Sequence, residues 1–154
     1  MIVAYRVCKT RYPVFDGTVA EIAGGRWNSR GRPVIYCADS FAGALLEILV
    51  HANAPVALPG PHHCARAFID DAIPLESLAE DNLPGWADED AQLSRAYGDQ
   101  WLKEQRSVLL SVPAATARPY GRNLLLNPAH PDFARLVLEP PVAVSWDARL
   151  FRAR

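Results

Sequence analysis

Proline is distributed along most of the chain and limits the length of every element that the chain can form. Thirteen of the 154 residues are proline, well above the roughly 5% of an average protein. A proline removes a backbone donor, and it disrupts the interior of a helix or of a central strand. We therefore expect many turns and short elements rather than a long helical bundle.

Local apolar patterns predict both strands and helices. Residues 41–52 have apolar side chains at helical spacing, with Leu45, Ile48, Leu49 and Ala52 on one face and a capping residue at Asp39 or Ser40. Two further helices are expected at residues 74–83 and 87–104. Short β-rich runs predict strands at residues 2–7, 33–38, 64–69, 108–112, 124–126 and 149–152.

The remaining segments are less regular. Residues 8–25 are expected to form a loop, and residues 133–138 and 141–146 fit more than one structure. Because strands and helices mix without a regular βαβ alternation, the chain is predicted to be of the α+β class. Its length fits one domain spanning residues 1–154.

Composition excludes several classes of protein. Half of the residues are apolar and 21% are charged, as in a globular protein. No apolar run reaches the roughly 18–20 residues of a membrane helix, and the first residues lack the features of a signal peptide. The three scattered cysteines do not suggest a disulfide framework. We expect a cytoplasmic protein that has no contact with a membrane.

An arginine-rich segment is the first candidate for chemistry. Residues 24–32 combine Arg26, Arg30 and Arg32 with Trp27 and three glycines. Glycine lets the backbone approach a ligand closely, and arginine fits phosphate oxygens in a bidentate way. The segment is neither a GxGxxG fingerprint nor a Walker loop. The alternative is a surface hairpin whose arginines are solvated.

Glu47 is the second candidate. At about 100° per residue, Glu47 points away from the apolar face of its helix, with Gly43 and Ala44 one turn before and His51 one turn after. Small neighbours leave space beside the carboxylate, as a ligand cleft requires. A solvent-facing glutamate paired with His51 is the alternative.

A third segment contains Asn123, an apolar run, and the Asn127-Pro128 and His130-Pro131 steps. Asn123 could bind a sugar hydroxyl or a carboxamide. Asn127 and His130 are expected only to satisfy backbone groups in a loop.

In their order along the chain, these segments resemble the RES domain, the toxin half of RES–Xre toxin–antitoxin pairs. The resemblance covers most of the chain, and the spacing of Arg26, Tyr36 and Glu47 is its most specific part. It also includes residues 5–7, 25–28, 34–36, 44–51, 112–113 and 123–131.

The resemblance implies a fold related to ADP-ribosyltransferases, with two small β-sheets around a cleft for NAD and flanking helices. It implies cleavage of the nicotinamide–ribose bond of NAD, by hydrolysis, by phosphorolysis or by ADP-ribosyl transfer to a protein. It further implies an Xre-type helix-turn-helix antitoxin that blocks the cleft, so that any contact with DNA is indirect.

The family is named for an Arg, a Glu and a Ser, and this chain departs from that pattern at one place. Arg26 and Glu47 match the first two residues, but Ala114 stands where the serine usually follows the Val-Pro step. A hydroxyl there would contact the nicotinamide ribose or hold the glutamate. Ser111 and Thr116 are close enough in sequence to compensate.

The chemistry of NAD assigns expected roles to the candidates. Glu47 would stabilise the positive charge that develops on the ribose and orient the nucleophile. Arg6 and Arg26 would hold the pyrophosphate, and Tyr36, or Trp27 in second place, would stack on nicotinamide or pack under the ribose. Asn123 would fix the ribose or the carboxamide. No metal is required, because the leaving group is already a cationic pyridinium.

Two other functions remain open at this point. Ala114 allows a catalytically silent domain that only binds its antitoxin. The arginines beside Trp27 allow a nucleic-acid-binding module, although a net charge of −1 argues against it. A zinc site at residues 62–64 lacks a second ligand pair, and a Ser or Cys hydrolase lacks a nucleophile-elbow motif.

Overall fold

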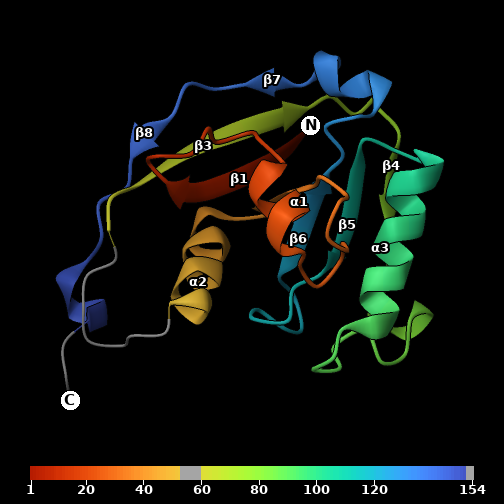
Figure 1. The fold of residues 1–154 in the computed structure, drawn as a ribbon. Helices are drawn as coiled ribbons and strands as arrows, with labels where there is room; N and C mark the ends of the chain where they lie inside the picture. The colour runs from red at the N-terminus through yellow and green to blue at the C-terminus, as the bar shows by residue number, and fades with distance from the viewer. Residues whose placement is uncertain (53–59, 152–154) are drawn as a thin grey trace.

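A single path of hydrogen-bonded strands runs through the computed structural model, which describes residues 1–52 and 60–151 (Figure 1). The strands are β1 (Ile2–Lys9), β2 (Ile35–Ala38), β3 (His62–Ile69), β4 (Leu75–Ser77), β5 (Leu109–Pro113), β6 (Arg122–Leu126), β7 (Val137–Leu138) and β8 (Val142–Ala143). Their order is β4-β5-β6-β2-β1-β3-β7, and β8 also pairs with β3. All neighbours are antiparallel except β4 and β5.

The sheet has a narrow seam between its two halves. β1 and β3 pair along eight residues and β2 and β6 along four, whereas β1 and β2 pair in register only at Tyr5 and Ala38. Near this pair, side chains of both strands line a cavity. The predicted α+β class is confirmed, and the strands expected in two small sheets are joined at this seam into one curled sheet.

Helices lie on the sheet and beside the seam. They are α1 (Thr18–Ala23), α2 (Phe41–His51) and α3 (Gln92–Glu104), with short 3₁₀ turns at Glu80–Asn82, Pro131–Arg135 and Ala148–Phe151. In Figure 1, α1 lies in front of β6, α2 lies below β1, and α3 stands beside β4 and β5. In the described part of the chain, every helix is too short or too polar to span a bilayer.

The central strands bury side chains on both faces. In β6, Leu124 and Leu126 pack into one apolar cluster with Ile35, whereas Leu125 points to a second cluster that contains Trp101 of α3. This alternation follows from the two-residue period of a strand. A third, smaller cluster attaches α2 to the seam through Ala44 and Val7.

The prediction of a helix at residues 74–83 is wrong. Residues 75–77 form β4, which pairs in parallel with β5 and places Leu75 beside Leu109. Arg106 makes a bidentate ion pair with Glu76 and holds the middle of this short strand. Because these contacts join residues that are far apart in the chain, the local sequence pattern could not predict them.

Other boundaries also differ. The expected loop at residues 8–25 contains α1, and the helix expected from residue 87 begins only at Gln92. Residues 86–91 form consecutive turns instead. A strand was also expected at residues 149–152. The structure describes this segment as far as residue 151, and that part belongs to the 3₁₀ turn Ala148–Phe151, so the prediction is wrong there. The helix at residues 41–52 is confirmed, and Ser40 caps it by accepting a 3.0 Å hydrogen bond from the amide of Gly43.

Candidate active site

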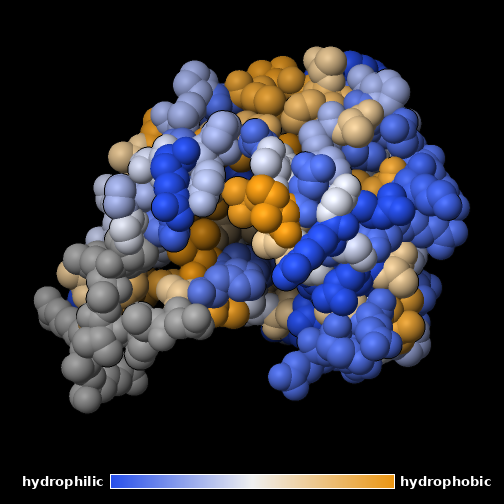
Figure 2. Space-filling model, in the orientation of Figure 1, coloured by the Kyte–Doolittle hydropathy of each residue, from blue (hydrophilic) through white to orange (hydrophobic). Residues whose placement is uncertain are grey.

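A cavity of about 480 Å³ lies at the seam. Its walls come from β1, β2, α1, α2, the arginine-rich segment, and the connection between β5 and β6. Figure 2 shows this face of the molecule hollowed near its centre, with apolar side chains at the edge of the hollow. Six of the seven predicted site residues line the cavity: Arg6, Arg26, Trp27, Tyr36, Glu47 and Asn123.

Glu47 presents its carboxylate from α2 to the cavity, and 27% of its side chain is exposed. The Thr116 hydroxyl donates a 2.6 Å hydrogen bond to Oε1, and Nδ2 of Asn123 donates one of 3.2 Å to the same oxygen. The other oxygen, Oε2, lies 3.8 Å from Nε2 of His51. Glu47 is therefore held by two donors inside a cavity, and the solvent-facing pair with His51 is only part of its surroundings.

Ala114 does not line the cavity. It is buried, with 3% of its surface exposed, and its amide donates a 3.1 Å hydrogen bond to the Gly121 carbonyl. The hydroxyl of Ser111 instead accepts a 3.0 Å hydrogen bond from Nε of Arg122. Of the two residues named as substitutes for the family serine, Thr116 alone contacts Glu47 in the described structure.

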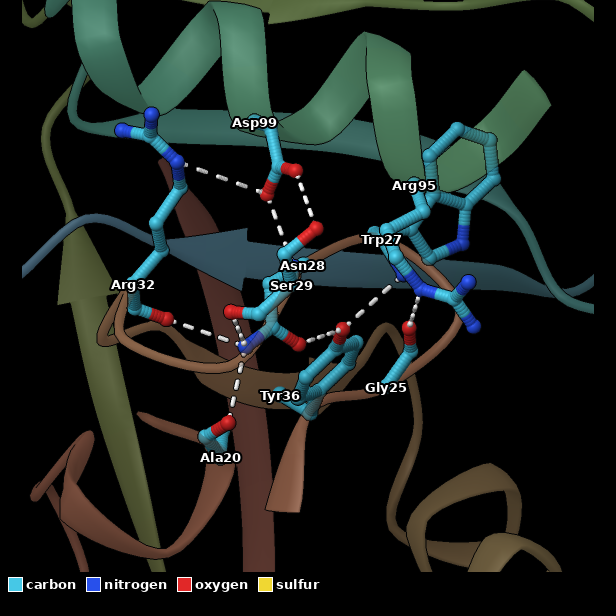
Figure 3. Close-up of polar contacts among 9 residues, drawn as sticks. All are labelled: Ala20, Gly25, Trp27, Asn28, Ser29, Arg32, Tyr36, Arg95 and Asp99. Carbon is cyan, nitrogen blue, oxygen red and sulfur yellow. Dashed lines mark hydrogen bonds and ion pairs between the residues drawn. The ribbon is translucent and has the colours of Figure 1, made fainter. Parts of the chain in front are cut away.

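Two hydrogen bonds fix the hydroxyl group of Tyr36 (Figure 3). Its hydroxyl donates a 2.6 Å hydrogen bond to Oδ1 of Asn28 and accepts one of 3.0 Å from the Trp27 amide. Burial raises the pKa of this phenol well above its ordinary value. The hydroxyl is therefore neutral and already bonded, which leaves the ring as the part that can meet a ligand.

The structure corrects the alternative role given to Trp27. Only 1% of this residue is exposed, and its indole stacks on Trp86 with ring centroids 6.2 Å apart and meets Tyr97 edge-on. The indole is thus a core side chain, and it is not placed to stack on a ligand. The residue borders the cavity while its amide positions Tyr36.

Arg6 and Arg26 both reach the cavity, but each also binds backbone carbonyls. Arg6 donates to the carbonyls of Val14 at 3.2 Å and Tyr36 at 2.8 Å. Arg26 donates through one terminal nitrogen to the carbonyls of Trp86 at 3.1 Å and Asp88 at 2.9 Å. These bonds fix the direction of both guanidinium groups, and each group retains further N–H donors for an anion.

Asn28 holds the cavity wall together, a role that the sequence analysis did not predict. It is fully buried, and its amide nitrogen donates to the carbonyls of Ala20 and Arg32 at 2.8 and 2.9 Å. Asp99 of α3 secures the same segment by accepting hydrogen bonds from the amide and hydroxyl of Ser29. The position of Asn28 beside Trp27 in a glycine- and arginine-rich run was the available signal (Figure 3).

The site holds neither a thiol nucleophile nor a metal cluster in the residues described. Cys37 borders the cavity, but burial raises the pKa of its thiol to about 12, although the charge of Arg6 acts in the opposite direction. Across residues 1–52 and 60–151, the acidic, histidine and cysteine side chains form no group of three suited to a metal ion. His63 instead contacts the Tyr12 carbonyl at 2.8 Å.

Known proteins resemble this chain over most of its length. A relative from Sphingobium sp. (strain YBL2), named Prs ADP-ribosylating toxin, is 38% identical over 145 residues, which are 89% of this chain and 86% of that protein. A protein of Pseudomonas putida named Toxin Res is 36% identical and covers 91% of this chain and 94% of its own length.

A solved structure shares the fold. The crystal structure of the M. tuberculosis MbcT-MbcA toxin-antitoxin complex contains a chain that superimposes with a TM-score of 0.76 at 20% identity, covering 94% of this chain and 84% of that one. The model of the RES domain matches residues 3–147. Together with the relatives, this match shows that the chain belongs to the RES domain family.

Proposed function

We propose that this protein is the toxin of a toxin–antitoxin pair, and that it binds NAD and cleaves the nicotinamide–ribose bond. Membership of the RES domain family and the names of the relatives support this function. The observation that carries it is the Glu47 carboxylate, held by Thr116 and Asn123 in a cavity that two arginines also line.

The carboxylate suits the charge that this reaction develops. When the bond between C1′ of the ribose and the pyridinium nitrogen breaks, its electron pair leaves with nicotinamide, which becomes neutral. Positive charge then develops on C1′ and the ring oxygen, as in glycoside hydrolysis. A fixed carboxylate nearby stabilises that charge more than it stabilises the substrate.

The rest of the cavity would hold the substrate. Arg6 and Arg26 supply oriented N–H donors for the pyrophosphate. The ring of Tyr36 offers an apolar face for the nicotinamide or the ribose, and Asn123 has a second amide hydrogen for a ribose hydroxyl. This division of roles needs no metal.

The acceptor decides which reaction follows. Water, phosphate or a protein side chain would form the new bond to C1′ and lose a proton, which Glu47 can accept. The Sphingobium relative is named as an ADP-ribosylating toxin. We include transfer of ADP-ribose to a protein beside the breakdown of free NAD, because one cavity and one carboxylate serve both.

An antitoxin is the proposed partner, and it would cover the mouth of the cavity. The M. tuberculosis structure that shares the fold is a complex of a toxin with its antitoxin. Here α1 and α2 expose apolar side chains that line the cavity: Val19 is 41% exposed and Val50 58%. Exposed apolar side chains gathered at one place favour a protein partner, which we propose is an Xre-type antitoxin.

Nicotinamide release tests the function directly. The purified protein is incubated with NAD, with and without phosphate, and with labelled NAD and a cell extract as a source of protein acceptors. We expect release by the unmodified chain and a decrease of about 10²–10³-fold in Glu47→Gln. Glu104→Gln is the matched control, since it removes an exposed carboxylate at the end of α3, outside the cavity.

The outcomes separate the alternatives. Label on protein identifies ADP-ribosyl transfer, and free ADP-ribose or its phosphate identifies hydrolysis or phosphorolysis. If the folded protein releases no nicotinamide under any of these conditions, the enzymatic proposal is wrong and a silent antitoxin-binding domain remains. Undiminished release by a folded Glu47→Gln protein would remove Glu47 from the reaction.

A further inference from the structure

We infer that Thr116 is the positioning residue of Glu47 in this chain, and that its hydroxyl does the work expected of the serine that is missing at Ala114. The inference rests on the proposed function, because it concerns how the catalytic carboxylate is held. It explains how a chain that lacks the family serine can keep a complete site.

The first support is the direction of the hydrogen bond. An ionised carboxylate only accepts hydrogen bonds, so the Thr116 hydroxyl is the donor in the 2.6 Å contact with Oε1 of Glu47. A hydrogen bond of this length to a charged acceptor is among the stronger kinds in proteins. Thr116 also lines the cavity, whereas Ala114 does not.

The second support is that the two donors to Glu47 converge on one oxygen. Asn123 donates to the same Oε1 at 3.2 Å, and it lies in β6, directly after the loop that carries Thr116. With Oε1 occupied twice, Oε2 is the oxygen left to face a ligand. Rotation of the carboxylate would break both bonds, so Thr116 and Asn123 together fix its orientation in the cavity.

The third support is the rigidity of the loop between β5 and β6. The Ala117 amide donates to the Ala114 carbonyl at 3.2 Å, and the Gly121 amide donates to the Ala117 carbonyl at 2.7 Å. A Cβ at Gly121 would lie 2.3 Å from the Cβ of Ala117, so the loop closes tightly on itself. The backbone thus holds Thr116 two residues beyond the buried Ala114.

The test compares three variants with the unmodified protein. Thr116→Val keeps the shape of the side chain but removes the hydroxyl, and Thr116→Ser keeps the hydroxyl but removes the methyl group. Thr10→Val is the matched control, because Thr10 is exposed and lies outside the cavity. Nicotinamide release is measured over a range of NAD concentrations, and folding is checked by urea unfolding.

We expect kcat to decrease about tenfold to a hundredfold in Thr116→Val, as for a lost hydrogen bond to a charged group. KM for NAD should change much less, because the carboxylate acts mainly in the transition state. Thr116→Ser should restore most of kcat, and Thr10→Val should match the unmodified protein. A residue with a purely structural role would not give this combination of a kcat loss and rescue by serine.

The inference is overturned if folded Thr116→Val keeps the kcat of the unmodified protein, while the proposed function then stands. If the unmodified protein releases no nicotinamide, the proposed function fails. In that case, the urea midpoints of Thr116→Val, Glu47→Gln and the double variant still test the contact. Effects that simply add would show that the two side chains do not interact, and this would overturn the inference as well.

Discussion

The hydroxyl of Tyr36 donates a 2.6 Å hydrogen bond to the side-chain oxygen of Asn28, a residue with no exposed surface. The amide nitrogen of Asn28 in turn donates to the carbonyls of Ala20 and Arg32. One buried side chain thus joins α1, the arginine-rich segment and β2 around the cavity (Figure 3). The wall that carries Arg26 depends on this amide.

Replacing Asn28 with Asp should destabilise the protein by about 2–4 kcal/mol. The variant is nearly isosteric, but it loses both donors and places a carboxylate opposite two carbonyl oxygens in a buried position. Urea unfolding measures the change, with Asn82→Asp in an exposed turn as the control. A stability equal to that of the unmodified protein would contradict the role assigned to the Asn28 amide.

Gly98 should be intolerant of alanine although it lies inside α3. A Cβ at this position would be 1.7 Å from the Trp27 carbonyl oxygen, so the helix or the arginine-rich segment would have to move. In an exposed helix position, the same change would stabilise by up to about 1 kcal/mol. We expect a loss of at least about 2 kcal/mol in urea unfolding. A neutral or stabilising effect would show that the contact can relax easily.

The sequence predicted those helices and strands that depend mainly on neighbouring residues in the chain. The helix that carries Glu47 follows from its apolar spacing and from Ser40 at its start, and both survive in the structure. The parallel pairing of Leu75 with Leu109 joins residues far apart in the chain. It overrides a local pattern that favoured a helix.

The candidate site shows the same limit. The local pattern singles out Glu47 and Arg26 as candidates, whereas Tyr36 is singled out only by the resemblance to the RES domain. The pattern does not show that Trp27 turns inward onto Trp86, because a tryptophan beside arginines fits a ligand site equally well. The choice between Ser111 and Thr116 needed the fold, since only the path of the β5–β6 loop decides which hydroxyl reaches Glu47.

Cys37 should resist alkylation in the folded protein at pH 8. Burial raises the pKa of its thiol to about 12, so the reactive thiolate forms only near that pH, far above the ordinary range. Iodoacetamide treatment followed by peptide mass spectrometry should leave Cys37 unmodified until urea unfolds the chain. Rapid alkylation of Cys37 in the folded state would show that the thiol is accessible and would reopen a role in chemistry.

Replacing Arg26 with Ala should weaken NAD binding about tenfold or more, because a charge-assisted contact to phosphate is lost. Its bonds to the carbonyls of Trp86 and Asp88 predict that Arg26→Lys recovers only part of the affinity, since a lysine cannot donate to both carbonyls and a phosphate in the same planar geometry. Calorimetric titration with NAD measures the dissociation constants. Arg135→Ala, which removes an exposed arginine paired with Asp132, is the control. Full recovery by lysine would mean that charge alone matters at this position, and an unchanged affinity in a folded Arg26→Ala protein would remove Arg26 from the binding site.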